Sequence, residues 1–216
     1  MSEVLLVSGV SGRDDPWHDF GATSAAIAEI LATDGLDVAL LPSGEVRDAD
    51  LEAADLLVVN CGLDSAPGAD SAATAAFVEV LRSRRPVLGV HTAANAFAAV
   101  PAWTDRLGVR WVEGVSMHPP IGWLAEPPDQ AHPIGAGLDV VEAFDERYSN
   151  LDINRPAEIV LFHSLDGVEQ PLSLARQDPD GRRTVYDALG HGPESYASTS
   201  RGELLRREVN WLLATR

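Results

Sequence analysis

Pro86-Val87-Leu88-Gly89-Val90-His91-Thr92-Ala93-Ala94-Asn95 is the stretch from which the fold can be worked out. A short apolar run ends there in a Gly-x-His-x-Ala turn, and a helical pattern of small residues follows at once. This is the outline of a strand–turn–helix elbow, which lifts one side chain above the carboxyl edge of a sheet. Acyl-transfer enzymes place Ser or Cys at the tip of such a turn. This chain has His91 there, so the functional question is what a histidine does at that position.

The first half of the chain alternates apolar runs with helical patterns. Continuous apolar runs bounded by turn residues are typical of strands buried on both faces of a sheet. We expect strands at 4–8, 38–41, 56–60 and 87–90, and helices at 22–35 and 69–84. This alternation predicts an α/β fold with a doubly wound, mostly parallel sheet.

The second half changes character and predicts a peripheral antiparallel extension. Runs at 109–118 and 122–126 flank Pro119-Pro120, and further strands are expected at 159–164 and 172–176. The turn Asp178-Pro179-Asp180-Gly181 predicts that 172–176 pairs with 183–188 as a hairpin. An amphipathic helix covering 204–212 ends the chain. Because no long linker or repeat divides the sequence, we expect residues 1–216 to form a single domain.

Composition limits the kinds of ligand. The net charge is −17, from 33 acidic and 16 basic residues, and every basic residue is an arginine. A chain without lysine can form neither a Schiff base nor a Walker-type phosphate loop. Such an acidic surface repels nucleic acid and anionic membranes. A small neutral ligand fits it better than a polyanion does, and pairing with a second copy of the chain is left open.

Cysteine content and the N-terminus bear on location. The single cysteine, Cys61, excludes an internal disulfide and a cysteine-based zinc cluster. The first residues lack the basic region and long apolar region of a signal peptide, and no apolar run reaches the ~18 residues needed to cross a bilayer. We therefore expect a cytoplasmic protein.

Three histidines are predicted to meet at one edge of the sheet. Ligands of open α/β sheets bind at the carboxyl ends of the strands. His18 follows the first strand, His91 lies on the elbow, and His191 follows the last strand. A single histidine is more often structural than catalytic, so the expected convergence carries the hypothesis. The three imidazoles suit acid–base catalysis or binding of a divalent metal, most plausibly zinc.

Other residues are weaker candidates. His118 and His132 lie beside prolines and either line the same cleft or cap a loop. Asp145-Glu146-Arg147-Tyr148 offers two carboxylates and a phenol, although a solvated loop explains it equally well. Tryptophans that could stack on a sugar ring are Trp17, Trp103, Trp111 and Trp123. His163 is expected in the core, and Cys61 is expected to be a buried hydrophobic residue because no cysteine elbow surrounds it.

Taken together, these segments resemble the trehalose-utilisation (ThuA-like) family of the class I glutamine amidotransferase-like superfamily. The matching pieces, in order, are the His18 loop, Gly89-Val90-His91-Thr92-Ala93, His118 before a proline, His132-Pro133-Ile134 with Gly137-Leu138, Asp145-Glu146-Arg147-Tyr148, and Val185-Tyr186-Asp187-Ala188-Leu189-Gly190-His191. The superfamily has a cysteine at the elbow and a His-x-Glu pair near the C-terminus. Here His91 replaces the cysteine, and Glu194 follows His191 by three residues.

The resemblance implies a flavodoxin-like fold, a site in the cleft at the strand edge, and a role in handling sugars or keto-sugars. Cysteine-dependent amidotransferase chemistry is not expected. We hypothesise an enzyme whose catalytic residues are His91, His191, His18 and Glu146, with His18, His91 and His191 as candidate metal ligands. The alternative is a sugar-binding or regulatory domain that lost the elbow nucleophile. Residues expected to contact substrate are Trp17, Asp145, Tyr148, His118, His132 and Glu194.

Overall fold

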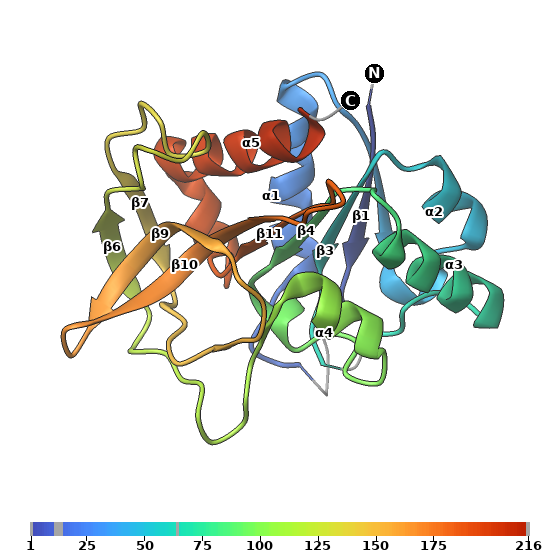
Figure 1. Cartoon of the computed structure of the whole chain (residues 1–216), viewed down its shortest axis with the longest axis horizontal. Coiled ribbons are helices and arrows are strands. Elements are labelled where there is room, and N and C mark those ends of the chain that lie inside the picture. The colour runs from blue at the N-terminus through green and yellow to red at the C-terminus, as the bar shows by residue number, and fades with distance from the viewer. Residues whose placement is uncertain (1, 11–14, 64, 215–216) are drawn as a thin grey trace.

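A seven-stranded sheet in the order β2-β1-β3-β4-β11-β10-β9 forms the centre of the molecule (Figure 1). This arrangement comes from a computed structural model, which describes residues 2–10, 15–63 and 65–214. The strands from β2 to β11 run parallel, whereas β10 and β9 are antiparallel. The expected α/β, doubly wound, flavodoxin-like sheet with an antiparallel extension is confirmed.

The strands of the main sheet are β1 (Glu3–Ser8), β2 (Asp37–Pro42), β3 (Leu56–Asn60), β4 (Val87–Val90), β9 (Glu158–Leu165), β10 (Val168–Gln177) and β11 (Arg183–Asp187). Two small antiparallel pairs join β5 (Val109–Arg110) to β8 (Asp152–Ile153) and β6 (Gly122–Glu126) to β7 (Val141–Asp145). The α-helices are α1 (Phe20–Thr33), α2 (Asp48–Ala53), α3 (Ser71–Arg82), α4 (Pro101–Leu107) and α5 (Thr199–Leu213).

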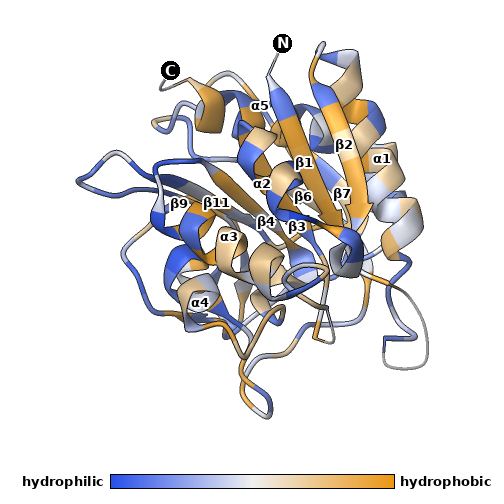
Figure 2. Cartoon of the chain, turned by 90° about the vertical axis from the view of Figure 1, so that its right-hand side faces the viewer, coloured by the Kyte–Doolittle hydropathy of each residue, from blue (hydrophilic) through white to orange (hydrophobic). Residues whose placement is uncertain are grey.

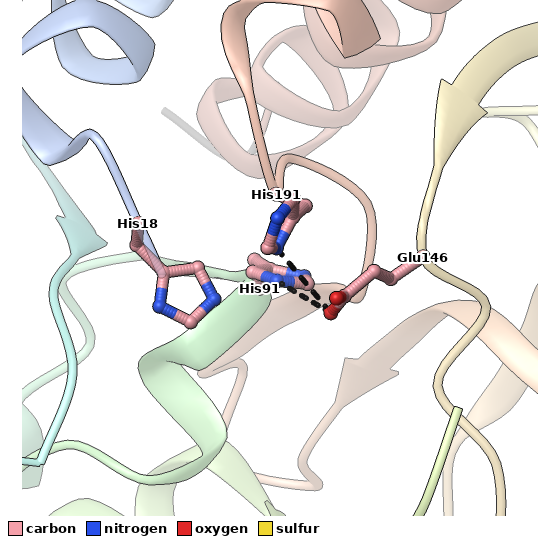
Figure 3. Close-up of side chains that lie close together, drawn as sticks. All are labelled: His18, His91, Glu146 and His191. Carbon is pink, nitrogen blue, oxygen red and sulfur yellow. Dashed lines mark ion pairs between the residues drawn. The ribbon is translucent and has the colours of Figure 1, made fainter. Parts of the chain in front are cut away.

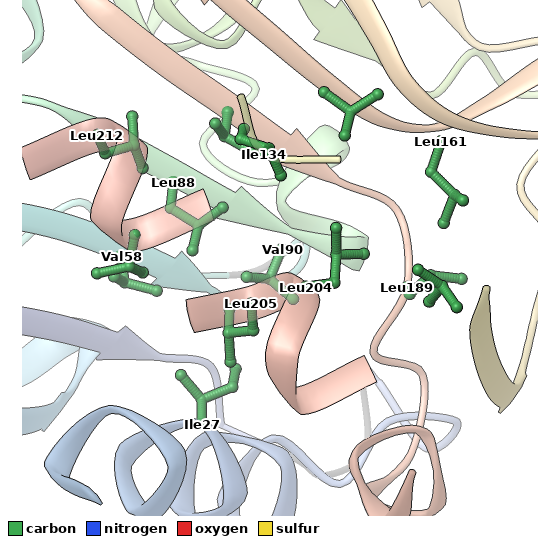
Figure 4. Close-up of a cluster of buried hydrophobic side chains, with 14 of the residues drawn as sticks. Ile27, Val58, Leu88, Val90, Ile134, Leu161, Leu189, Leu204, Leu205 and Leu212 are labelled. Atoms are coloured by element: carbon green, nitrogen blue, oxygen red, sulfur yellow. The ribbon is translucent and has the colours of Figure 1, made fainter. Parts of the chain in front are cut away.

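Helices cover both faces of the sheet and create two hydrophobic cores. One core packs α1 and α5 against the sheet through side chains such as Ile27, Leu204 and Leu205 (Figure 4). The other packs α2, α3 and α4 against the opposite face. Figure 2 shows the apolar strands β1 and β2 beside helices of mixed hydropathy. Among the described residues, no helix combines the length and apolarity that crossing a bilayer requires.

Aspartate side chains cap the N-termini of α1 and α3. The Asp19 carboxylate accepts the N–H of Ala22 and begins α1, and the Asp70 carboxylate accepts those of Ala72 and Ala73 and begins α3. Aspartate favours this position because it satisfies N–H groups that have no partner within the helix. The N-cap residue Asp19 directly follows His18, so the start of α1 helps to fix the position of His18.

Two expectations about local structure are wrong. No α-helix follows the elbow at once: His91–Ala94 forms a single 3₁₀ turn, and α4 begins only at Pro101. Phe97 has φ of 51°, which a right-handed helix does not allow. The strand expected at 109–118 ends at Arg110 as β5. Beyond it the chain turns back, because the N–H of Val112 donates to the Ser116 hydroxyl.

A buried charge cluster lies beneath α5. Arg201 and Asp187 are fully buried, and the guanidinium lies 2.6 Å from the carboxylate. The carboxyl group of Glu208 is also fully buried and accepts a hydrogen bond from the Ser173 hydroxyl. Burial, together with the nearby Asp187 carboxylate, raises the pKa of Glu208 well above its ordinary value. One arginine therefore neutralises Asp187, while Glu208 remains protonated.

This cluster predicts that stability falls as pH rises. Above about pH 4.3 the unfolded chain has lost the proton of Glu208, whereas the folded chain keeps it. Folding must then take up a proton, and stability falls by up to about 1.4 kcal/mol per pH unit until the folded group ionises. Glu208→Gln keeps a neutral group in place. In urea denaturation between pH 5 and 8, the free energy of unfolding of this variant should depend less steeply on pH than that of the wild type. Glu169→Gln, at an exposed position of β10, should leave the pH dependence unchanged, and an unaltered slope in Glu208→Gln would refute the assignment.

Candidate functional site

His91 lies at the tip of the elbow in a strained backbone conformation. Its φ is 48°, in the left-handed region that non-glycine residues rarely adopt, and its side chain is buried. Gly89, in β4, lets α4 pack closely against the strand, because a Cβ there would lie 2.5 Å from a Leu107 methyl group. The strand and the sharp turn of the predicted elbow are therefore present, with an imidazole at the tip, although a 3₁₀ turn replaces the helix expected after it.

Two hydrogen bonds orient the His91 ring. Its Nδ1 lies 2.7 Å from the carbonyl oxygen of Ala188, which can only accept, so Nδ1 carries the hydrogen. Nε2 then presents a lone pair, to which the Tyr148 hydroxyl donates at 3.0 Å. Burial, together with the nearby His18, lowers the pKa of His91 well below its ordinary value, so the ring is neutral.

His18 is oriented in the same way by a carboxylate. Its Nδ1 lies 2.7 Å from Asp15 Oδ1, and the Asp15 carboxylate also accepts the backbone N–H of His18. The ring stacks on Phe20, the first residue of α1. Burial lowers the pKa of His18 despite the opposing effect of Asp15. Nε2 of His18 is buried and has no hydrogen-bond partner within the described part of the chain.

Glu146 brings a carboxylate into the group of histidines. Its Oε2 lies 3.3 Å from His191 Nδ1 and 3.6 Å from His91 Nε2, and its Oε1 lies 3.4 Å from His118 Nε2. Figure 3 shows His18, His91, His191 and Glu146 pointing toward one another from separate segments. The expected convergence of three histidines at the carboxyl edge of the sheet is confirmed as geometry, and Glu146 joins them.

The pKa shifts of Glu146 and His191 favour their charged forms, whereas those of His91 and His18 favour neutral rings. The Glu146 carboxylate raises the pKa of His191 above its ordinary value, against the opposing effect of burial. Burial alone would raise the pKa of Glu146, but His191, with smaller effects from His118 and His18, lowers it. The site therefore holds a charge-bearing pair next to two neutral imidazoles.

Asp145 positions this pair. Its carboxylate is fully buried and accepts the backbone N–H groups of Glu146, Gly190 and His191 at 2.8, 2.8 and 3.1 Å. Burial raises the pKa of Asp145, although these donors oppose the rise. Asp145 was expected to contact substrate, but it does not line the cavity. The Asp145 carboxylate instead joins the end of β7 to the loop that follows β11.

The remaining candidates divide between the cavity and other regions. A cavity of about 410 Å³ lies against the histidines. Its described lining is Asp15, Trp17, His18, Gly62, Leu63, Thr92, Asn95, Trp111, His118, Glu146, Tyr148 and His191. Trp17, His118 and Tyr148 therefore lie where a substrate contact was expected. Asp15 was missed, although its spacing of three residues before His18 is a signal that could have been used.

His132 and Glu194, which were expected to contact substrate, do not belong to the described lining of the cavity. His132 is buried beside Trp211 of α5, and its Nδ1 accepts the N–H of Ile134, so it caps its own loop. Glu194 lies exposed in the 3₁₀ helix Pro193–Ala197.

The other residues considered from the sequence are structural. His163 is buried, with Nε2 3.1 Å from the Ser149 hydroxyl, as expected for a core histidine. Cys61 is fully buried, and burial raises the pKa of its thiol to about 12. Trp103 is a core residue whose indole N–H donates to the Ala93 carbonyl. Trp123 is exposed outside the described cavity lining.

One known protein family matches nearly the whole chain. The family model described as "Trehalose utilisation" (ThuA) matches residues 3–212. The chain belongs to the ThuA family. No curated protein sequence matches this ThuA-family chain.

Solved structures share its fold. A ThuA-like protein from Parabacteroides merdae is 20% identical with a TM-score of 0.80, and the match covers 100% of this chain and 91% of the other. A ThuA-like protein from Bacteroides uniformis is 16% identical with a TM-score of 0.73, covering 99% and 92%. A glutamine amidotransferase from Thermotoga maritima is 14% identical with a TM-score of 0.59, covering 99% of each chain. At these identities the likeness shows the fold alone.

The role of Asp145 can be tested through stability. Asp145→Ala leaves three backbone N–H groups without their acceptor, so the free energy of unfolding should fall by at least about 2 kcal/mol. Urea denaturation measures the change. Asp139→Ala, an exposed aspartate in a nearby loop, is the control and should have little effect. Equal stability of the two variants would contradict a positioning role.

Proposed function

We propose that this ThuA-family protein is an enzyme that acts on a sugar or keto-sugar by acid–base chemistry centred on histidine. One observation carries the proposal: three imidazoles and a carboxylate from four distant segments meet at one cavity at the carboxyl edge of the sheet. Histidines that only stabilised the fold would not be expected to gather at one cavity.

The Glu146–His191 pair is suited to moving protons. Both side chains line the cavity, and their facing atoms are 3.3 Å apart. A positioned acid and base accelerate proton removal next to a carbonyl group, or protonation of a glycosidic oxygen. In this proposal His191 and Glu146 exchange protons with substrate. His18 orients the reacting group from the side of the cavity, and His91, buried behind the lining, positions Tyr148.

The remaining lining supports a sugar as the ligand. The rings of Trp17, Trp111 and Tyr148 line the cavity together with the amide of Asn95. Aromatic rings offer apolar faces to the C–H faces of a sugar, while polar side chains bind its hydroxyl groups. A volume of about 410 Å³ lies within the range of small-molecule sites. The family description and the net charge of −17 agree with a small, neutral ligand.

Covalent catalysis by a thiol has no support in this chain. Cys61 is the single cysteine, and it is fully buried with a raised pKa. The hydroxyl of Thr92, next to the elbow tip, donates to the Cys61 carbonyl. A Cys-dependent amidotransferase reaction therefore does not fit the residues at this elbow.

The proposal is tested by turnover of mono- and disaccharides and their keto derivatives, with products identified by mass spectrometry and NMR. Glu146→Gln and His191→Asn should each lower kcat/KM by about 10²- to 10⁴-fold, because each removes one proton-transfer group. Glu194→Gln, which lies outside the cavity lining, is the matched control and should retain the activity.

Wild-type turnover in both Glu146→Gln and His191→Asn would overturn the proposal. Sugar binding by the wild-type protein with no turnover of any sugar would also overturn it, and would favour the non-catalytic sugar-binding domain instead.

The exposed Trp17 gives a second prediction. Trp17→Ala should raise KM roughly tenfold with little change in kcat, because it removes a surface that binds ground state and transition state alike. Trp123→Ala is the matched control: Trp123 is 71% exposed against 70% for Trp17 but lies outside the described cavity lining. Steady-state kinetics distinguish the two, and equal KM values would exclude Trp17 from substrate binding.

A further inference from the structure

One buried nitrogen atom in the site lacks a hydrogen-bond partner, and a second is paired with Glu146. Within the described residues, His18 Nε2 is shielded from solvent and makes no hydrogen bond, and His191 Nδ1 has Glu146 Oε2 at 3.3 Å. Native structures rarely leave buried polar atoms unsatisfied, because each costs a lost bond to water. Both atoms belong to the group around Glu146, so one ion there can satisfy His18 Nε2 and take the place of the proton between His191 and Glu146.

The tautomers of two rings point to what that partner is. Asp15 accepts from His18 Nδ1, and the Ala188 carbonyl accepts from His91 Nδ1. In both rings Nε2 therefore carries a lone pair, which in His91 accepts from the Tyr148 hydroxyl in the absence of an ion. Metal-binding histidines have this arrangement: an outer carboxylate or carbonyl accepts one ring N–H, and the other nitrogen faces the ion.

The four side chains are also close enough to share one ion. One ligand atom from each of His18, His91, Glu146 and His191 can be chosen so that all lie within 4.8 Å of one another. Bonds of about 2.1 Å in a tetrahedral site place ligand atoms about 3.4 Å apart. The contacts of Glu146 Oε2 with His191 and His91, at 3.3 and 3.6 Å, already have this spacing.

We propose that His18, His91, Glu146 and His191 bind one divalent transition-metal ion, with zinc as the best fit. Three imidazoles and one carboxylate favour zinc and its neighbours over magnesium or calcium, which prefer oxygen ligands. Asp15 and the Ala188 carbonyl orient the ligands without touching the ion.

The position of this ion relates it to the cavity. His18, Glu146 and His191 line the cavity, whereas His91 is buried behind them. The ion therefore lies at the floor of the cavity, where a sugar oxygen can reach it. The inference concerns metal binding itself: with the ion bound, Glu146 and His191 are ligands, so the proton transfers proposed above belong to the metal-free protein.

Metal binding is tested with untagged protein that has been dialysed against a chelator. Titration with ZnCl₂ should show one ion per chain by elemental analysis. Excess zinc, at about 100 times Kd, should raise Tm by about 5 °C or more. Replacement by Co²⁺ should produce visible absorption bands that report the ligand set.

Variants assign the ligands. His18→Ala and Glu146→Gln should each abolish stoichiometric binding, and Asp15→Asn should weaken binding by about 10- to 100-fold. His132→Asn, a buried histidine outside the cavity lining, is the matched control and should bind one ion. Circular dichroism of each variant confirms that it folds.

Two results would overturn the inference. One is less than a tenth of an equivalent of zinc, cobalt, manganese or nickel on the wild-type protein, and the other is unchanged binding in both His18→Ala and Glu146→Gln. Turnover of sugar by such a metal-free protein would leave the acid–base proposal intact. The two proposals can therefore fail separately.

Discussion

The hydrogen bond between His91 Nδ1 and the Ala188 carbonyl is the contact on which the site depends. It joins the elbow after β4 to the end of β11, and the Tyr186 hydroxyl strengthens this connection by donating to the His91 carbonyl at 2.9 Å. A left-handed backbone at a bulky residue is costly, and it persists only where surrounding contacts determine it. The same bond sets the tautomer of His91 and turns Nε2 toward Glu146. Backbone geometry and site chemistry are thus fixed by one interaction.

Adjacent carboxylates at the end of β7 have two different roles. Asp145 is fully buried and holds the backbone N–H groups of Gly190 and His191, while Glu146 faces the imidazoles. Successive side chains of an extended chain point to opposite sides, so two neighbouring acids can serve a structural and a chemical purpose. Asp145 places the His191 backbone, and Glu146 then meets the His191 ring. Asp145 therefore sets the position of His191, and Glu146, the next residue, supplies the charge that faces its ring.

The fold is shared with a glutamine amidotransferase, but the residues at the elbow are not those of thiol chemistry. His91 stands where a nucleophile would be exposed, and it is buried and neutral. The one thiol lies in the core. A common scaffold supports unrelated chemistries, because function depends on the side chains placed at the strand edge. In this chain the edge holds a cluster of imidazoles and a carboxylate.

The sequence by itself determined the strands of the main sheet and the general location of the site. β3, β4 and β6 have the expected bounds, because continuous or alternating apolar runs reflect local backbone preferences. His18, His91 and His191 could be placed together because parallel strands end at one edge. Only the tertiary structure decided which loop residues reach that edge. His132 and Glu194 lie elsewhere, Asp145 points inward, and Asp15 lines the cavity. The direction of a loop side chain depends on partners far along the chain, such as Gly190 for Asp145, and no local pattern records them.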